Sequence, residues 1–191
     1  MINRYREYLS VLDKKLQNMF QKQSVFIKCK KGCAHCCKKG KYPMSELEFI
    51  NIMFYYNSLP DEEKSVINSQ IQDLIKDEMP NSYVCPFLYN DSCSVYPARA
   101  LICRSFGLMT FYQDKKMIPF CVDLGLNYAE VYDDNKSRVV KTASDGTEPL
   151  AFNVDRRTLR SQTIEKNFNI FFGDDKSLYD WLKEEFLQNE N

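Results

Sequence analysis

The chain has 191 residues, and its 26 lysine and arginine residues balance 26 aspartate and glutamate residues, so the formal net charge is zero. This balance leaves no global basic field, which argues against a protein dedicated to binding DNA, RNA or an anionic membrane. The length predicts a single domain, residues 1–191, that buries a core without crosslinks. The N-terminal MINRYREYLS lacks the apolar run of a secretory signal, and no segment is apolar enough to cross a bilayer. We therefore expect a cytoplasmic protein without a membrane partner.

Three helices are predicted in the first 80 residues. Apolar residues recur at three- and four-residue steps up to about residue 22, which indicates an amphipathic helix. Ser45 and Glu48 have the spacing of a capping box, so a second helix is expected to run to about Asn57, and a third follows Pro60. The stripes expected to pack in the core are Ile2, Tyr5, Leu9, Leu12, Leu16 and Met19; Leu47, Ile50 and Phe54; and Ile67, Ile71, Leu74 and Ile75.

The middle of the chain has a less regular pattern. Pro80, Pro86 and Pro97 divide it into loops, leaving room for a short helix at about 98–106. The stretches LMTFY and MIPFCV predict a strand pair joined through QDKK. Residues 133–149 predict an irregular surface loop with a turn at Asp145-Gly146.

The C-terminal part is expected to be helical at 155–172 and 177–188. We predict a mainly α fold: one domain of about five to six helices around an irregular cysteine-rich metal-binding segment, 29–121, with a small β-hairpin. Residues 1–28 and 150–191 are the helical flanks in this description. The inner face of the last helix is expected to comprise Leu178, Trp181, Leu182 and Phe186.

All eight cysteines lie in the central segment, which is informative because a reducing compartment disfavours disulfides. Clustered cysteine there indicates metal or redox chemistry. Cys33-Ala-His-Cys36 is a C-x-x-C unit, whose spacing lets two thiolates of one turn bind the same ion. The late cysteines are Cys85, Cys93 and Cys103. The predicted metal ligands are Cys29, Cys33, Cys36, Cys37, Cys85, Cys93, Cys103 and Cys121.

A single closed site is expected to join the two ends of this segment. Cys33 and Cys36 would supply one half, and at least two of the late cysteines the other. Sulfur atoms about 4 Å apart would indicate Zn²⁺, whereas a wider polygon, about 6 Å across, would indicate an iron–sulfur cluster such as [4Fe-4S]. Cys37 and Cys121 are left for a second site or for packing.

Basic residues surround the candidate site. Four thiolates on Zn²⁺ or on a [4Fe-4S]²⁺ core leave a net charge of about −2, which nearby cations would compensate while lowering the thiol pKa values. A solvated basic face and a local polyanion site remain alternatives. The lysines concerned are Lys28, Lys30, Lys31, Lys38, Lys39 and Lys41.

The sequence also suggests roles for one histidine and two arginines near the cysteines. His35 lies inside the C-x-x-C turn and is expected to point away from the ion. Arg99 and Arg104 flank Cys103 and are candidate cofactor-binding residues, because guanidinium groups tune a cluster or hold an anionic ligand. Surface ion pairing is the alternative role for both arginines.

The order Cys29-x3-Cys33-x2-Cys36-Cys37, followed by Cys85-Pro-Phe-Leu, Cys93-Ser-Val-Tyr and Cys103-Arg, resembles the YkgJ family, whose hallmark is a CxxCxxCC cluster. The resemblance covers about residues 29–106 and implies a zinc- or iron-chelating domain. Two features depart from the family pattern: the first gap is three residues long, and Ala100 stands where a proline is usual. A related cysteine pattern occurs in flagellin lysine N-methylases, so the resemblance also implies an enzymatic alternative.

Two functional hypotheses follow. The first is a metal-binding protein whose thiolates chelate zinc or an iron–sulfur cluster in a structural or metal-handling role, with the metal ion as its partner. The second is an iron–sulfur enzyme related to the lysine N-methylases. The sequence contains neither a Gly-rich phosphate loop nor a G-x-S-x-G motif, and its single histidine leaves little material for a catalytic triad. The sequence leaves open whether the protein is an enzyme.

Overall fold

The computed structural model describes residues 1–30, 32–76, 78, 80–113, 115–133, 138–139 and 142–187. Apart from the first two residues, the chain forms two compact units that are described separately. Unit 1 comprises Asn3–Lys30 and Arg104–Ile170, and unit 2 comprises Lys31–Cys103 and Phe171–Asn191. The single-domain organisation stays a prediction.

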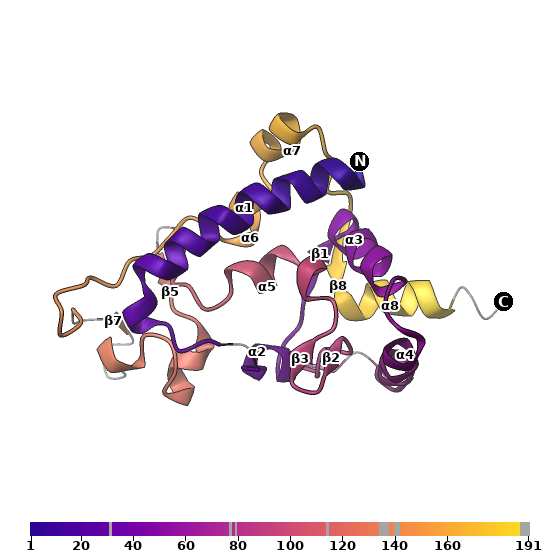
Figure 1. Ribbon diagram of the computed structural model, residues 1–191, viewed down its shortest axis with the longest axis horizontal. Coiled ribbons are helices and arrows are strands. Elements are labelled where there is room, and N and C mark those ends of the chain that lie inside the picture. Colours follow the sequence, from indigo (N-terminus) through magenta and orange to yellow (C-terminus); the bar gives the residue numbers. More distant parts are fainter. Residues whose placement is uncertain are drawn as a thin grey trace. The chain divides into compact units, whose positions relative to one another are not determined.

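The mainly α fold is confirmed, and the sheets are small antiparallel pairs of strands (Figure 1). In the described part of the chain, no helix combines the length and the apolar character needed to cross a membrane. The longer helices are α1 (Ile2–Lys22), α3 (Glu46–Tyr56), α4 (Asp61–Ile75) and α8 (Leu178–Leu187); the shorter ones are α2 (His35–Lys38), α5 (Leu101–Ser105), α6 (Arg156–Leu159) and α7 (Gln162–Phe168).

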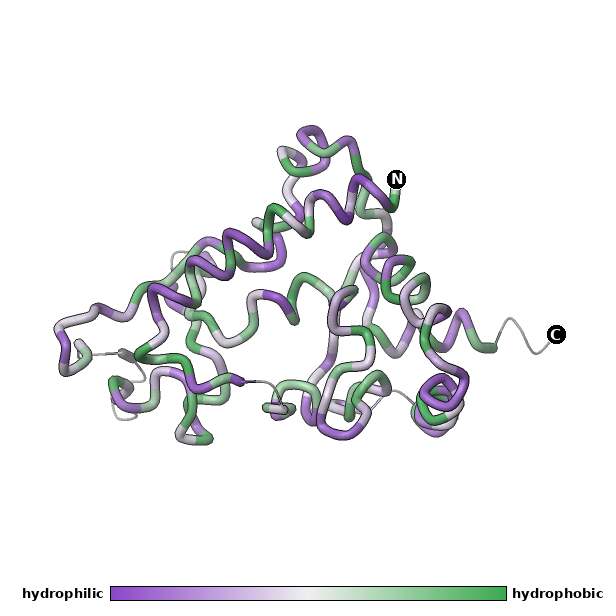
Figure 2. The backbone as a smooth tube through the Cα atoms, viewed as in Figure 1, coloured by the Kyte–Doolittle hydropathy of each residue, from purple (hydrophilic) through white to green (hydrophobic). Residues whose placement is uncertain are grey.

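Unit 1 is organised along α1, where hydrophobic and hydrophilic residues alternate as the helical period requires (Figure 2). The Tyr8 hydroxyl donates a hydrogen bond of 2.6 Å to the carbonyl of Leu159 at the end of α6. The Tyr8 ring also lies 5.1 Å from the ring of Phe168 in α7. The predicted N-terminal helix is thus confirmed, and its buried residues are Tyr5, Tyr8, Leu9, Leu12 and Leu16.

The predicted strand pair of unit 1 is present with a shifted second strand. Strand β4 (Thr110–Tyr112) pairs with β5 (Lys115–Met117), so most of MIPFCV lies beyond the hairpin. Pro119 has no N–H to donate to a ladder, and Phe120–Leu124 forms a 3-10 helix instead.

The predicted loop 133–149 is partly ordered at its start. Strand β6 (Tyr132–Asp133) pairs with β7 (Arg138–Val139), while 134–137 and 140–141 lie outside the described residues. The expected turn at Asp145-Gly146 is present: Gly146 has a φ of 84° and its N–H bonds the Ala143 carbonyl at 3.0 Å.

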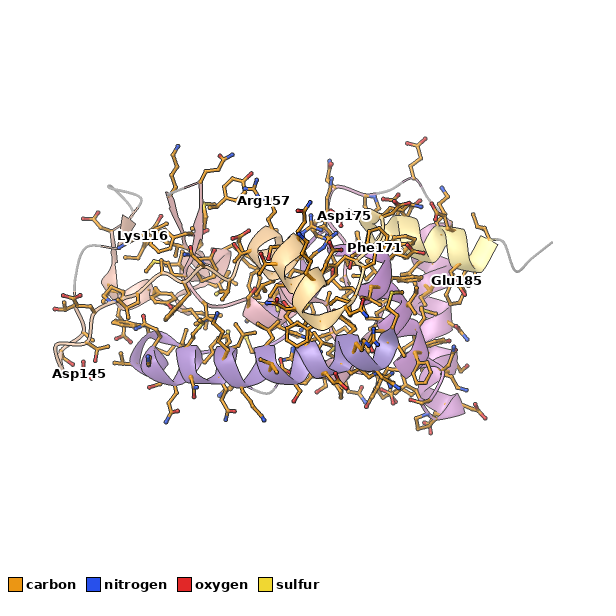
Figure 3. All side chains as sticks on the ribbon, turned by 90° about the horizontal axis from the view of Figure 1, so that it is seen from above. Lys116, Asp145, Arg157, Phe171, Asp175 and Glu185 are labelled. Atoms are coloured by element: carbon orange, nitrogen blue, oxygen red, sulfur yellow. The ribbon has the colours of Figure 1, made fainter. Side chains whose placement is uncertain are left out.

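The single helix expected at 155–172 is divided into α6 and α7. The Asp155 side chain caps α6 by accepting a hydrogen bond from the Arg157 amide at 2.9 Å, and Ser161 begins α7. Asn169, with a φ of 50°, ends α7 in the left-handed region. Arg157 (Figure 3) stacks on the Tyr112 ring at 4.3 Å, which attaches α6 to β4.

Unit 2 places two helices directly after two paired strands. Strand β1 (Pro43–Ser45) pairs with β8 (Asp175–Ser177), and the chain enters α3 from β1 and α8 from β8 (Figure 1). Sequence analysis did not find this pairing, because both strands are short and far apart along the chain. The core between α3, α4 and α8 includes Phe49, Ile52, Tyr56, Ile67, Ile71, Ile75, Leu178, Trp181 and Leu182.

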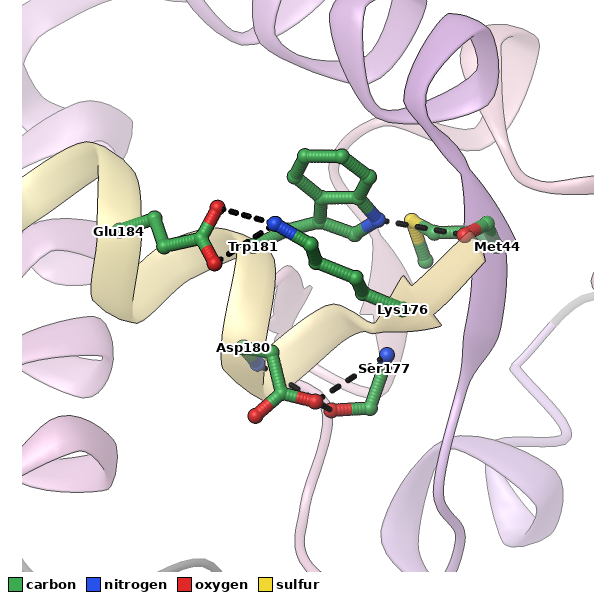
Figure 4. Close-up of polar contacts among 6 residues, drawn as sticks. All are labelled: Met44, Lys176, Ser177, Asp180, Trp181 and Glu184. Atoms are coloured by element: carbon green, nitrogen blue, oxygen red, sulfur yellow. Dashed lines mark hydrogen bonds and ion pairs between the residues drawn. The ribbon is translucent and has the colours of Figure 1, made fainter. Parts of the chain in front are cut away.

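The start of α8 is fastened by polar contacts shown in Figure 4. Asp180 accepts a 2.6 Å hydrogen bond from the Ser177 hydroxyl, and Trp181 donates its indole N–H to the Met44 carbonyl at 3.2 Å. Lys176 pairs with Glu184 at 2.6 Å. The Trp181 bond attaches α8 to β1, and the other two contacts attach it to β8; the predicted C-terminal helix is present.

Helix α3 has its capping box as predicted, but its predicted buried stripe was wrong at two positions. Ile50 and Phe54 are 42% and 56% exposed. The face turned inward carries Glu48 and Asn51, whose side chains make buried hydrogen bonds within unit 2. The prediction therefore chose the wrong one of two helically spaced apolar stripes. The stripe that packs in the core is Phe49, Ile52 and Tyr56.

Candidate metal centre

The early cysteines of unit 2 lie on and before the single turn of α2. The amide of Cys37 donates to the Ala34 carbonyl at 2.9 Å, which forms this turn. It places the sulfur atoms of Cys36 and Cys37 3.9 Å apart. Cys33, the other member of the C-x-x-C unit, is partly buried in the preceding loop.

Two backbone hydrogen bonds join the early and late cysteine segments. Tyr83 N–H donates to the Gly40 carbonyl at 3.2 Å in an antiparallel bridge, and Cys85 N–H donates to the Cys37 carbonyl at 2.8 Å. The expectation that the two ends of the cysteine-rich segment meet is confirmed for these residues. Their contact depends on the backbone and does not require a metal.

Gly40 also lets the ring of Tyr42 lie close to the backbone where the two cysteine segments pair. A Cβ atom there would lie 3.0 Å from the Tyr42 ring. The Tyr42 hydroxyl donates to the Cys36 carbonyl at 2.9 Å, and its ring packs edge-to-face on Tyr83 at 5.4 Å. Burial raises the pKa of Tyr42, and the nearby thiolates of Cys85, Cys37, Cys103 and Cys36 raise it further. Tyr42 is therefore a neutral donor that holds the Cys36 backbone.

Cys93 is presented by a tight hairpin. Strand β2 (Leu88–Tyr89) pairs with β3 (Ser92–Cys93), and Leu88 lies opposite Cys93. Asn90 and Asp91 have φ values of 49° and 54°, as a two-residue type I′ turn requires. Cys85 and Cys93 both pack against the hydrophobic core of unit 2, so the hairpin places thiols beside an apolar environment.

The late thiols and Cys36 lie within electrostatic range of one another. Burial raises the pKa of Cys85 well above its ordinary value, and Cys103, Cys93 and Cys36 raise it further. The pKa of Cys103 is raised to about 12, mainly by burial and further by the nearby Cys93 and Cys36. Cys103 keeps accessible surface, yet the surrounding protein removes much of its hydration. We call Cys36, Cys85, Cys93 and Cys103 the four-thiol group.

The two candidate arginines have different environments. Arg99 stacks on the Tyr96 ring at 3.9 Å and donates to the Tyr96 carbonyl at 2.8 Å. Its charge partly opposes the effect of burial on the pKa values of Cys93 and Cys103. Arg104 belongs to unit 1, where its buried guanidinium pairs with Asp13 at 2.5 Å. Arg99 thus lies within electrostatic range of thiols, and Arg104 forms an ion pair; the cofactor-binding role of both stays a prediction.

Two of the lysines around the motif form ion pairs with acidic residues that are distant in sequence. Lys28 pairs with Glu130 at 3.0 Å in unit 1, and Lys38 pairs with Asp91 at 2.5 Å in unit 2. Lys31 lies outside the described residues. The pair of Lys38 with Asp91 connects α2 to the hairpin turn, although such exposed pairs contribute little stability.

Unit 1 contains the remaining two cysteines in different settings. Cys29 accepts a hydrogen bond from the Asn127 side-chain amide at 3.2 Å, and the same amide donates to the Gly107 carbonyl at 2.9 Å. The Asn127 oxygen accepts from the amides of Lys28 and Cys29 at 2.8 and 3.2 Å. Cys121 is buried, with 3% of its surface exposed. Asn127 was missed because a lone asparagine in a loop has no recognisable motif.

In the described part of the chain, no group of three or more histidine, cysteine, aspartate or glutamate side chains is arranged to hold a metal ion. The closed sulfur tetrahedron expected from the spacing is therefore not found among those residues in this conformation. The donor chemistry nevertheless fits zinc or iron, since several desolvated thiols destabilise one another's charged forms and a bound cation reverses that penalty.

Comparison with known families agrees with this donor chemistry. Residues 28–122, about half of the chain, match the CxxCxxCC family, described as "Putative zinc- or iron-chelating domain". The chain belongs to this family. The CxxCxxCC match encloses all eight cysteines and therefore includes residues of both units. No curated protein and no solved structure matches the chain.

Proposed function

We propose that the protein binds zinc or iron through the four-thiol group of unit 2. The observation that carries this proposal is the backbone hydrogen bond from Cys85 to Cys37, which brings the late cysteine segment beside the turn that bears Cys36. The pKa values of Cys85, Cys93 and Cys103 support it, since burial and neighbouring sulfur atoms raise them. Cysteines that only pack in a core gain no stability from lying close to other thiols. A divalent cation makes this closeness favourable, because it binds the thiolate form of each sulfur.

A metal in this position would connect segments that the backbone already brings near one another. Cys36 comes from α2, Cys85 from the paired loop, Cys93 from the hairpin and Cys103 from α5. The sulfur atoms would have to reorient by side-chain rotation, which leaves the backbone pairing intact. Ligation would thereby add stability to unit 2, since metal binding to a folded site is coupled to folding. We therefore assign the metal a structural role.

We do not assign the other four cysteines to the four-thiol group, and among them only Cys33 is kept as a predicted further ligand. Cys37 is adjacent to Cys36, and neighbouring residues rarely bind one ion together, so Cys37 is a neighbour of the site. Cys33 belongs to the loop before α2 and stays a predicted ligand. Cys29 and Cys121 belong to unit 1, and their predicted ligand roles are not part of the proposal.

The test compares Cys36, a proposed ligand, with its neighbour Cys37, which is not one and serves as the control. Protein purified without chelator under anaerobic conditions is expected to carry zinc or iron in stoichiometric amount, with the visible spectrum distinguishing colourless zinc from iron. Cys36→Ser should remove most of the metal, while Cys37→Ser should retain it. A folded, metal-free wild-type chain whose thiols all react freely would contradict the proposal, as would equal metal loss in the two variants.

A further inference from the structure

Glu48 is a carboxylate with no solvent exposure that contacts the segment carrying Cys103. Its Oε1 accepts a hydrogen bond of 2.8 Å from the amide of Leu101, the first residue of α5. Its Oε2 accepts from the Ser45 amide at 2.9 Å and from the Ser45 hydroxyl at 2.7 Å. One buried side chain therefore completes the capping box of α3 and also holds the start of α5.

Asn51 adds a second attachment from the same face of α3. Its side-chain amide donates to the Ala98 carbonyl at 3.4 Å, three residues before Leu101. Helix α3 thus bonds the connecting segment on both sides of Arg99 and Ala100. Cys103 is the third residue of α5, and its amide bonds the Ala100 carbonyl at 3.0 Å. The direction in which α5 presents this thiol depends on the segment held by α3.

The capping box alone does not require this arrangement. A capping box uses the acid at its third position to accept from the N-cap amide, a role that one carboxylate oxygen fulfils. Here the second oxygen accepts a hydrogen bond from the amide of Leu101, the first residue of α5. A glutamine has one carbonyl oxygen and cannot accept at both places. The two-sided contact explains a buried acid better than helix capping by itself.

We propose that Glu48 is a positioning residue for the metal ligand Cys103, acting through the Leu101 amide. This inference rests on the proposed metal-binding function and names a residue that does not touch the ion. Residues that orient ligands from outside the coordination sphere typically change metal affinity by roughly 10- to 100-fold. Glu48 also lies in electrostatic range of Cys103, where its charge disfavours the free thiolate. Its benefit for ligation is therefore geometric.

The experiment is a double-mutant cycle on the full chain, with Zn²⁺ affinity measured by competition with a chelator. Glu48→Gln is expected to weaken Zn²⁺ binding at least about 10-fold in the wild-type background. In the Cys103→Ser background the same change should weaken it less than about 2-fold, because the ligand that Glu48 positions is gone. Ile71→Val, a change in the buried core of unit 2, serves as the destabilised control and should alter affinity less than about 2-fold.

The outcomes separate the inference from the function it rests on. An equal loss from Glu48→Gln in both backgrounds, no loss in either, or a matching loss from Ile71→Val would overturn the positioning role. Unchanged Zn²⁺ affinity in Cys103→Ser would instead overturn the proposed four-thiol site.

Discussion

Cysteines in the two units occupy contrasting environments. In unit 2, burial and the neighbouring Cys36 raise the pKa values of the late thiols, two of which pack against a hydrophobic core. In unit 1, Cys29 is held by the amide of Asn127, and Cys121 is buried. The cysteines of this chain therefore differ in their surroundings, although they lie in one segment of the sequence. The surroundings of each sulfur, rather than the number of cysteines, are the basis on which we propose the four-thiol group as the ligand set.

The largest expected effect is loss of the metal, and it should be confined to unit 2. Cys85→Ala removes a member of the four-thiol group, so we expect loss of nearly all bound zinc or iron and a lower melting temperature. Cys121→Ala shortens a buried side chain and should keep the metal content while lowering stability. Elemental analysis and thermal unfolding of both variants check this. Metal loss in Cys121→Ala as large as in Cys85→Ala would erase the contrast.

Asn127→Ala should destabilise unit 1 without affecting the metal. The change leaves the amides of Lys28 and Cys29 and the Gly107 carbonyl without this partner, which costs about 2–3 kcal/mol. Denaturant unfolding measures the loss. Asn127→Asp is the matched variant, because it keeps the acceptor and replaces the donor that faces Cys29. If either variant released the metal, Cys29 would belong to the ligand set after all.

The metal-free protein should lose stability as the pH rises from about 8 to 9.5. Burial raises the pKa of Cys85, so the folded state keeps a proton that the unfolded thiol releases above its ordinary pKa of about 8.5. Stability then falls by roughly 1 kcal/mol per pH unit for one such thiol. Urea unfolding of reduced, chelator-treated protein tests this sign. Zinc should reverse it, because ligation uses the thiolates; a flat profile in both states would contradict the raised pKa values.

The smallest effect is expected from the exposed ion pair that links α2 to the hairpin. Removing Lys38 or Asp91 should change the free energy of unfolding by about 0.5 kcal/mol or less, since both side chains are largely exposed. A double-mutant cycle with Lys38→Gln and Asp91→Asn measures their coupling. A coupling above about 1 kcal/mol would show that charge, as well as the backbone pairing at Cys37 and Cys85, joins these segments.

Local signals in the sequence were enough to predict several elements. The period of apolar residues predicted α1 and α4, the spacing of Ser45 and Glu48 predicted the capping box, and Asp145-Gly146 predicted a turn. Each depends on residues within about one or two turns of each other. The same reasoning misassigned Ile50 and Phe54 to the core, because α3 carries two apolar stripes with helical spacing and only its packing decides which one is buried.

For the candidate site, the sequence by itself determined the donor chemistry: eight cysteines in one segment, their grouping into early and late sets, and the family to which the chain belongs. Only the tertiary structure decided which thiols share an environment. The hydrogen bond between Cys85 and Cys37 brings the turn of Cys36 beside the late segment, and the bond between Leu101 and Glu48 holds the start of the helix that carries Cys103; both join residues remote in sequence. The physical reason is that desolvation and thiolate repulsion depend on distances in space, which residue spacing along a chain does not define.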